Sequence, residues 1–452
     1  MVNWKTYTLV AVMMAAAGFG SVNSSHKSVP ADFRDAVADD KDFNISLQDI
    51  GVADIGLLTI KPAMAEEKSA QKQEVSVLYQ AQSLKVIGES PKRVRDLTIM
   101  VYAVGERSFA YSINSMIAGN TSERVNMIVG FDDPKTGGRY VHIKDGSGSK
   151  LVKVSGRNND PADWREFVDF GKWAKSNFPA KKYVLLVAGH GSAWWNDTSK
   201  PMTPNKGIGY DTGDGSGSSN YITTVELGMA LREISGVDVL LLNSCGQQTI
   251  ELAYEVSDSV KVIAGGETVT YRTVVDSDSA AGNRNFRMFM ERISSNPLMT
   301  NEEIGKFFVL ALANRLDNPQ EVLPGTLSAL KTENLATFAE HIRSFVSEAT
   351  KEDNLWLKNC VKKTYAIPFY ERQSDLIEFV KIVTARTKNE QLKTIGKTLT
   401  DYYENKILIF LSRDTERLHG VSIYLPLEWY DSDYNELRFK KDTGWARLIG
   451  AY

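Results

Sequence analysis

A histidine and a cysteine each follow a short apolar run, and these two residues are the ones best suited to nucleophilic chemistry. The run Tyr183–Ala188 ends shortly before His190, and the run Val237–Leu242 ends shortly before Cys245. Aliphatic runs of about six residues bounded by glycine are typical of strands buried on both faces. In open α/β sheets, catalytic groups gather beyond the carboxyl ends of such strands. We therefore predict that Cys245 is a thiolate nucleophile and that His190 is its base.

The predicted thiolate needs a lowered pKa, and its reaction needs hydrogen-bond donors. A free thiol has a pKa of about 8.5, so an imidazolium at His190 and the start of a helix expected at 247–256 would both favour the anion. The backbone amides of Gly191 and Cys245 are expected to form the oxyanion hole. Glycine at 191 and 246 would let a substrate approach the backbone closely. The alternative is a cysteine buried as a small apolar residue and a histidine on the surface.

The elements that must position these residues alternate between strands and helices from residue 97 onward. This alternation predicts an α/β fold with a mostly parallel sheet flanked by helices. Thr223 and Glu226 have the spacing of a capping box, which predicts a helix at 224–234. The expected strands are 97–104, 125–130, 183–188, 237–242 and 260–265, with a hairpin formed by 137–144 and 148–154.

Residues 300–410 have mainly helical patterns, and a late strand follows them. We expect residues 420–426 to return to the main sheet or to a neighbouring one. The expected helices of this region are 302–313, 327–350, 375–388 and 392–405.

The N-terminal 25 residues have the pattern of a secretory signal. Lys5 precedes an apolar stretch at 7–20, and small polar residues follow it. An apolar helix packed on the protein is the alternative. No later run approaches the roughly 18 apolar residues that a spanning helix needs. We therefore expect a secreted or periplasmic protein that meets no membrane beyond export.

Composition and charge limit the classes of partner. The chain has 452 residues, of which 42% are hydrophobic and 24% charged, and its formal net charge is -3. This balance indicates a globular protein with protein or peptide substrates and no nucleic acid partner. The only cysteines, Cys245 and Cys360, predict no disulfide framework. We expect a monomer.

The chain divides into four segments by these patterns. We predict a signal peptide at 1–25, a pro-region or linker at 26–95 and a catalytic domain at 96–299. A mainly helical C-terminal region is expected at 300–452, and it returns the strand at 420–426.

Four blocks of sequence together resemble the clostripain family (C11) of cysteine peptidases, whose fold is similar to that of caspases and gingipains. The resemblance implies a caspase-like sheet, Cys245 as nucleophile, His190 as general base and an oxyanion hole made by the Gly191 and Cys245 amides. It also implies a secreted bacterial endopeptidase that is made as a zymogen and matures by cutting itself. The four blocks are Leu97–Gly105, Tyr183–Trp194, Gly209–Tyr254 and Gly420–Pro426.

Two positions near the nucleophile depart from the family pattern. Members of the family usually have Asp two residues before the cysteine, where it helps to bind a basic P1 side chain; this chain has Asn243. Glu267 could supply a compensating carboxylate in the S1 pocket. Because a desolvated charge facing Lys or Arg contributes strongly to discrimination, its loss predicts a weakened preference for basic P1 residues.

The altered S1 wall keeps other functions open. One is a caspase-like binding module with little or no turnover. The other is a thiol acyl-transferase, with ligase or sortase-like activity on the same nucleophile.

The long loop between the two candidate catalytic residues has two candidate roles. Lys206, which precedes Gly207, is the expected site of autocleavage; an ordinary solvated lysine is the alternative. Oxygens of Asp211 and Asp214 could bind calcium, because hard cations prefer several oxygen ligands, although an Asp- and Gly-rich turn needs no metal. We expect no cofactor to be required, and the histidines and cysteines have no zinc-site spacing.

Overall fold

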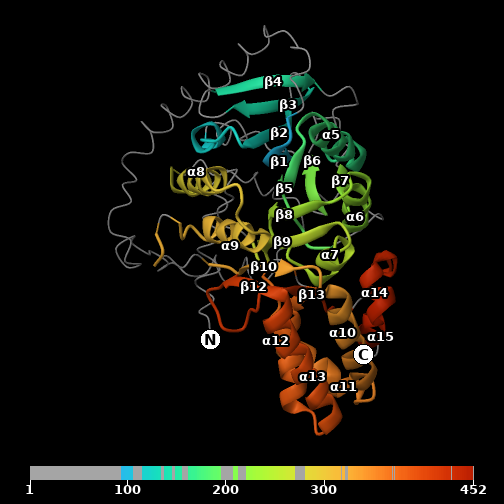
Figure 1. The fold of residues 1–452 in the computed structure, drawn as a ribbon. Helices are drawn as coiled ribbons and strands as arrows, with labels where there is room; N and C mark the ends of the chain where they lie inside the picture. Colours follow the sequence, from blue (N-terminus) through green and yellow to red (C-terminus); the bar gives the residue numbers. More distant parts are fainter. Residues whose placement is uncertain are drawn as a thin grey trace, which may run out of the picture. The chain divides into compact units, whose positions relative to one another are not determined.

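One central sheet of nine strands is found in the part of the chain that the structure describes, in the order β12-β10-β9-β8-β5-β1-β2-β3-β4 (Figure 1). The computed structural model describes residues 93–104, 115–133, 137–144, 148–154, 161–194, 207–211, 220–269, 280–316, 318–320, 324–368, 370, 372–428 and 430–450. The signal peptide predicted at 1–25 and nearly all of the segment predicted at 26–95 lie outside these residues.

The five strands at the centre of the sheet are parallel, as the aliphatic runs predicted. Each is buried on both faces along most of its length, which explains why its sequence is continuously apolar rather than alternating. These strands are β2 (Val125–Asp133), β1 (Arg95–Ala103), β5 (Ala180–Ala188), β8 (Val237–Asn243) and β9 (Val260–Gly266).

Antiparallel strands extend the sheet at both edges. The predicted hairpin is confirmed as β3 (Gly137–Lys144) and β4 (Gly148–Val154), and it continues the sheet beyond β2. At the opposite edge, β10 (Leu327–Lys331) pairs with β9, and β12 (Leu408–Ser412) pairs with β10. Residues beyond 299 therefore belong to the same sheet as the residues before them.

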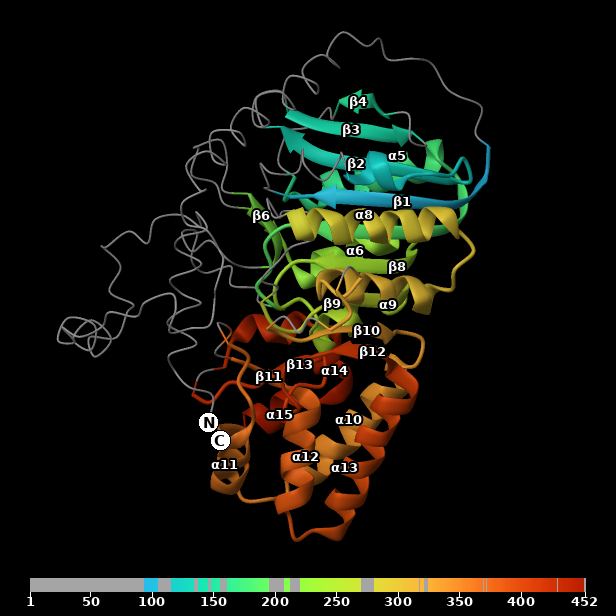
Figure 2. The same cartoon turned by 90° about the vertical axis from the view of Figure 1, so that its left-hand side faces the viewer.

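Helices cover both faces of the sheet, so that there are two hydrophobic cores. Successive side chains of each strand point to opposite faces and pack in one core or the other. In β8, Leu240 and Leu242 join one core, whereas Val239 and Leu241 join the other. The second core is covered by α8 (Ala280–Ser295) and α9 (Asn301–Leu312), which cross the face of the sheet seen in Figure 2. The first is covered by α5 (Trp164–Asn177), α6 (Thr224–Glu233) and α7 (Ile250–Glu255).

The predicted capping box at the start of α6 is confirmed. The Glu226 amide donates to the Thr223 hydroxyl at 3.1 Å, and the Thr223 amide donates to the Glu226 carboxylate at 2.9 Å. Two of the orphan donors at the helix N-terminus are satisfied in this way. The start of α6, which leads into the Cys245 strand, is thus fixed by local sequence.

The helix predicted at 327–350 is wrong at its beginning. Residues 327–331 form β10, and the helix α10 (Leu335–Ala349) begins only after Asn334. Leu327, Ala329 and Leu330 are buried between β9 and β12, so sheet pairing outweighs the helical propensity of this short run. The strand β12 was also missed.

The rest of the C-terminal region is mainly helical, as predicted. The late strand β13 (Ser422–Tyr424) does not join the main sheet; it pairs with β11 (Gln373–Asp375) in a separate two-stranded sheet. The helices are α10, α11 (Asn354–Lys363), α12 (Leu376–Arg386), α13 (Glu390–Tyr402), α14 (Arg438–Thr443) and α15 (Trp445–Ile449).

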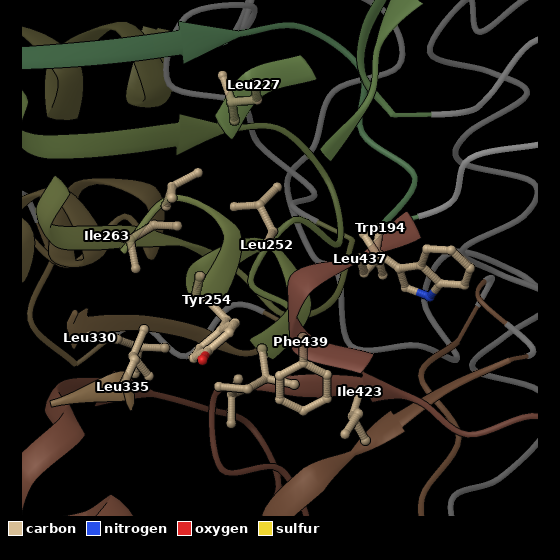
Figure 3. Packing of buried hydrophobic residues seen from close by; sticks show 14 of the residues in the cluster. Trp194, Leu227, Leu252, Tyr254, Ile263, Leu330, Leu335, Ile423, Leu437 and Phe439 are labelled. Atoms are coloured by element: carbon tan, nitrogen blue, oxygen red, sulfur yellow. The ribbon is translucent and has the colours of Figure 1, made fainter. Parts of the chain in front are cut away.

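The first core runs without a break from the main sheet into the C-terminal segments. Figure 3 shows Leu252 from α7 and Ile263 from β9 in one cluster with Ile423 from β13 and Phe439 from α14. Because apolar surface buried between the segments stabilises both, the region 420–450 is part of the same core as the parallel strands. Among the described helices, none has both the length and the apolar character needed to cross a bilayer.

Candidate active site

The register of two neighbouring parallel strands places His190 and Cys245 at the same edge of the sheet. β5 pairs with β8 so that Ala188 lies opposite Asn243, and His190 and Cys245 each follow two positions later. The Gly189 amide donates to the Asn243 carbonyl at 3.4 Å, which continues the pairing into the turns. Adjacent strands are about 4.8 Å apart. The two residues that the sequence singled out therefore leave the sheet side by side.

The turn after His190 packs directly on the turn that holds Cys245. A Cβ atom added to Gly191 would lie 2.3 Å from the Cys245 carbonyl oxygen and 2.9 Å from the Gln247 side chain. No other residue fits at 191 without moving one turn away from the other. Glycine at 191, which we expected to give a substrate access to the backbone, is therefore also needed for the two turns to pack against each other.

Gly246 has an equally specific environment. Its φ is +65°, a conformation that favours glycine. A Cβ atom added there would lie 2.6 Å from a ring carbon of Tyr370. The Gly246 amide donates to the Thr268 carbonyl at 3.0 Å, which ties the Cys245 turn to the end of β9.

Gln247 joins the two turns through its side chain. This side chain is fully buried, and its Nε2 donates to the Ala193 carbonyl at 3.2 Å and to the Gly207 carbonyl at 3.1 Å. The Ser192 amide also donates to the Gly207 carbonyl, at 3.2 Å. One buried amide therefore holds the segment after Cys245 against the segment after His190.

The two cysteines differ in accessibility. Cys245 is a half-buried thiol at the sheet edge, whereas Cys360 is fully buried in α11. Burial raises the pKa of the Cys360 thiol, which keeps it protonated and unreactive. Of the two, only Cys245 has the exposure that a nucleophile needs.

The helix expected directly after Cys245 begins later than predicted. α7 begins at Ile250, and its cap is Thr249, whose hydroxyl accepts from the Leu252 amide at 3.1 Å. Two of the residues between Cys245 and this cap instead bond to the β9 side: the Gly246 amide donates to the Thr268 carbonyl at 3.0 Å, and the Gln248 amide donates to the Gly266 carbonyl at 2.9 Å. The expected contribution of a helix dipole beside Cys245 is therefore wrong, since dipole effects fall off within the first turn.

The two residues predicted for the S1 pocket, Asn243 and Glu267, are both buried. The Glu267 carboxyl accepts from the Gly420 amide at 2.8 Å and is hydrogen-bonded to Asp375. Burial, together with the negative charge of Asp375, raises the pKa of Glu267 well above its ordinary value. A buried carboxyl whose pKa is raised in this way is disfavoured as a charged wall for a substrate. An S1 role for either residue stays a prediction.

Three residues of the long loop have limited structural description. Lys206 and Asp214 lie outside the described residues, and Asp211 is described only as the last residue of β6 (Ile208–Asp211). β6 pairs with β7 (Asn220–Ile222), and Ile208 also bridges to Gly191. The predicted autocleavage and calcium sites stay predictions.

The sequence analysis did not identify two residues that lie far from His190 and Cys245 in the sequence and support the turns or their neighbours. Tyr370 has no sequence signal that would connect it with Cys245. Asp375 could have been found as a helix cap, because its carboxylate accepts from the Glu378 amide at 2.6 Å at the start of α12. His419, whose Nδ1 lies 3.0 Å from the Asp375 carboxylate, occupies a buried position.

Comparisons with known proteins agree with this fold. Residues 101–451 match the model of the clostripain family. Clostripain of Hathewaya histolytica is 27% identical over 179 residues, which are 36% of this chain and 33% of that protein, so the match spans about a third of the relative.

Two solved structures have a similar fold. A secreted C11 cysteine protease from Bacteroides thetaiotaomicron, in complex with an irreversible peptide inhibitor, has a TM-score of 0.58 at 16% identity and covers 78% of this chain and 98% of its own. An inactive zymogen C11 protease from Parabacteroides distasonis has a TM-score of 0.59 at 16% identity, with coverages of 78% and 99%. These likenesses confirm the predicted caspase-like architecture. With a family model that spans residues 101–451, this chain belongs to the clostripain (C11) family of cysteine peptidases.

Proposed function

We propose that this protein is an exported cysteine endopeptidase that hydrolyses peptide bonds with Cys245 as nucleophile and His190 as general base. The observation that carries the proposal is the pairing of β5 with β8, in which Ala188 lies opposite Asn243. Two strand ends in this register bring an imidazole and a thiol to one edge of the sheet, where α/β folds bind ligands. The half-buried state of Cys245 supports the same role.

The proposed reaction has two halves that share one base. His190 takes the proton of the Cys245 thiol, and the thiolate attacks the peptide carbonyl while the Gly191 and Cys245 amides hold the oxyanion. The C–N bond then breaks, and His190 gives its proton to the leaving amine. Water attacks the resulting thioester after giving a proton to His190, which returns this proton to the sulfur as the acid product leaves.

Replacement of the two cysteines separately tests the nucleophile. In Cys245→Ala, turnover of a fluorogenic peptide library should fall by at least about a thousandfold, because the residues of a catalytic unit are not interchangeable. Cys360→Ala is the matched control and should keep its activity, since that thiol is buried away from the sheet edge. Turnover that persists in Cys245→Ala would remove Cys245 as the nucleophile.

We propose that the P1 preference for Arg or Lys is weak. Asn243 carries no charge, and the Glu267 carboxyl is buried against Asp375. In Asn243→Asp, cleavage after Arg or Lys should increase relative to cleavage after apolar residues, and Asn243→Ser is the uncharged control. An unchanged P1 profile in Asn243→Asp would place the pocket wall elsewhere.

A caspase-like binding module with little turnover is the second candidate. The observation that favours it is the same lack of charge at Asn243, combined with the burial of Glu267. Thiol alkylation separates the two candidates: an active enzyme loses turnover in proportion to the modification of Cys245, whereas a binding module has no turnover to lose.

Processing and metal dependence follow from the same proposal. We propose autocleavage after Lys206, which should be absent both from Cys245→Ala and from Lys206→Ala. Calcium bound by Asp211 and Asp214 should raise turnover, and turnover of the peptides of a P1 profile measured with and without calcium tests this expectation. Removal of residues 1–25 on export is tested by sequencing the N-terminus of the secreted protein.

A further inference from the structure

Tyr370 contacts both of the turns that hold the proposed catalytic residues. Its hydroxyl donates to the Gly191 carbonyl at 3.0 Å, although the two residues are 179 positions apart in the sequence. Its ring lies against Gly246, where an added Cβ would come within 2.6 Å and 2.7 Å of two ring carbons. One side chain from the C-terminal region therefore meets the residue after His190 and the residue after Cys245.

The backbone around Tyr370 is itself fixed. The Tyr370 amide donates to the Ile367 carbonyl at 3.0 Å, and the Tyr370 carbonyl accepts from the Gln373 amide at 2.7 Å. Gln373 begins β11, which pairs with β13, and Ile367 is buried. Tyr370 is thus held through its own amide and carbonyl by two described residues of the fold, Ile367 and Gln373.

Three contacts close a triangle around the two turns. Gly191 packs on the Cys245 carbonyl, Tyr370 donates to Gly191, and Gly246 packs on the Tyr370 ring. Two of these contacts need glycine, and the third needs a phenol. The separation of the two turns depends on all three, because a turn held on one side only can move away from the other.

From this triangle we propose that Tyr370 is a positioning residue that sets the distance between the His190 imidazole and the Cys245 sulfur, and with it the thiolate fraction of Cys245. The proposal deepens the dyad proposed above and rests on it. Thiolate formation needs a close imidazolium, and reaction rates are sensitive to displacements of about 1 Å. Tyr370 touches neither the thiol proton nor the substrate carbonyl in this scheme; it acts through the two turns.

The test compares two tyrosines that make the same kind of bond. Tyr370→Phe keeps the ring and removes the hydroxyl. Tyr102→Phe is the matched control, because the Tyr102 hydroxyl donates to the Pro161 carbonyl at 2.8 Å in a buried site of the same sheet. Both variants lose one hydroxyl-to-carbonyl bond, so a purely structural effect should lower their Tm by similar amounts.

The readout is the iodoacetamide alkylation rate of Cys245 across pH, followed on the peptide that contains it, together with kcat and KM. In Tyr370→Phe the midpoint of the alkylation profile should move to higher pH. Below that midpoint the alkylation rate should fall roughly fivefold, because the free energy of one typical hydrogen bond corresponds to a rate factor of about this size. kcat should fall by a similar factor with little change in KM. Tyr370→Ala, which also loses the ring contact, should lose about a hundredfold in kcat.

Two results overturn the proposal. In the first, Tyr370→Phe and Tyr102→Phe have the same alkylation profile and kcat, which leaves Tyr370 a structural role only. In the second, Tyr370→Phe or Tyr370→Ala is faster than the wild type, which makes Tyr370 an obstruction. Failure of the dyad itself is read separately, from turnover that survives in Cys245→Ala, whereas the alkylation profile reports on the geometry of the thiol in either case.

Discussion

Two buried glutamates hold the same late segment of the chain, and they differ in what surrounds their carboxyl groups. Glu251, in the first turn of α7, accepts from the Tyr424 amide at 2.8 Å and from the Tyr434 hydroxyl at 3.0 Å. Glu267, directly after β9, accepts from the Gly420 amide at 2.8 Å. The segment 420–426 is therefore fixed to the core by two carboxyl groups, one at each end of β13.

The neighbours of each carboxyl group decide its charge. Burial raises the pKa of Glu251 to about 7, and hydrogen bonds from the Tyr424 amide and the Tyr434 hydroxyl oppose the effect. Burial also raises the pKa of Glu267, but the adjacent charge of Asp375 raises it further. A buried acid among tyrosines thus has a pKa of about 7, whereas the pKa of a buried acid beside a carboxylate is raised by a second cause as well.

This difference indicates how the C-terminal strand is attached. β13 makes no pairing with the main sheet among the described residues, yet its segment carries one of the four blocks that identified the family. Its attachment depends on two buried carboxyl groups with raised pKa values, which approach from the segments after Cys245 and after β9. Stability of this attachment should depend on pH on both sides, because above its ordinary pKa of 4.5 each acid binds a proton in the folded state that it loses in the unfolded chain.

The largest expected effect comes from removing Asp375, whose charge adds to burial in raising the pKa of Glu267. In Asp375→Ala, the amides of Glu378 and His419 and the Nδ1 atom of His419 lose their acceptor. Buried donors left without partners, together with a lost helix cap, should lower the free energy of unfolding by about 4 kcal/mol. Chemical denaturation at neutral pH measures this loss.

The control for Asp375→Ala is another helix cap. Asp163 caps α5 by accepting from the Arg165 amide at 2.9 Å, in an exposed site, and Asp163→Ala should lose only about 1 kcal/mol. Equal losses in the two variants would show that Asp375 acts as an ordinary cap. Without Asp375 the pKa of Glu267 should also fall, which would make the two glutamates alike.

The second effect is the pH dependence that Glu251 imposes. Its pKa is 4.5 in the unfolded chain and about 7 in the folded protein, so the folded state binds more protons between these values. Unfolding free energy should therefore decrease as pH rises from about 4.5 to about 7, by about 3 kcal/mol in total. Glu251→Gln, which mimics the protonated acid, should lack this decrease. Urea denaturation at several pH values between 5 and 8 measures both curves, and parallel curves would contradict the assignment.

Much of the sheet and the pairing of the candidate catalytic residues could be predicted from local sequence. Continuous aliphatic runs such as those of β5 and β8 are typical of buried parallel strands, and parallel neighbours end at one edge. The Thr223 capping box likewise depends on residues three positions apart. In these cases the residues that decide the structure are close together in the chain.

The rest depends on partners that the sequence does not identify. Leu327–Lys331 has no pattern that separates a buried strand from a helical turn, and only its pairing with β9 and β12 decides the outcome. Tyr370 is 179 positions from Gly191, and Asp375 is 44 positions from His419. The delayed start of α7 has the same origin, because Gln247 and Gln248 bond to the Gly207 and Gly266 carbonyls instead of continuing a helix from Cys245.

The smallest expected effect, measured at pH 5, is that of Glu267→Gln. A glutamine amide has the shape of the protonated acid, so its oxygen can still accept from the Gly420 amide and its nitrogen can donate to Asp375. At pH 5 the unfolding free energy should change by less than about 1 kcal/mol, and as pH rises further the variant should lack the decrease that Glu267 imposes on the wild type. The same denaturation series used for Glu251→Gln measures it. If Glu267→Gln instead keeps the pH curve of the wild type, then the folded protein does not hold a proton on Glu267 over this range, and the neighbouring Asp375 carboxylate is not what separates the two sites.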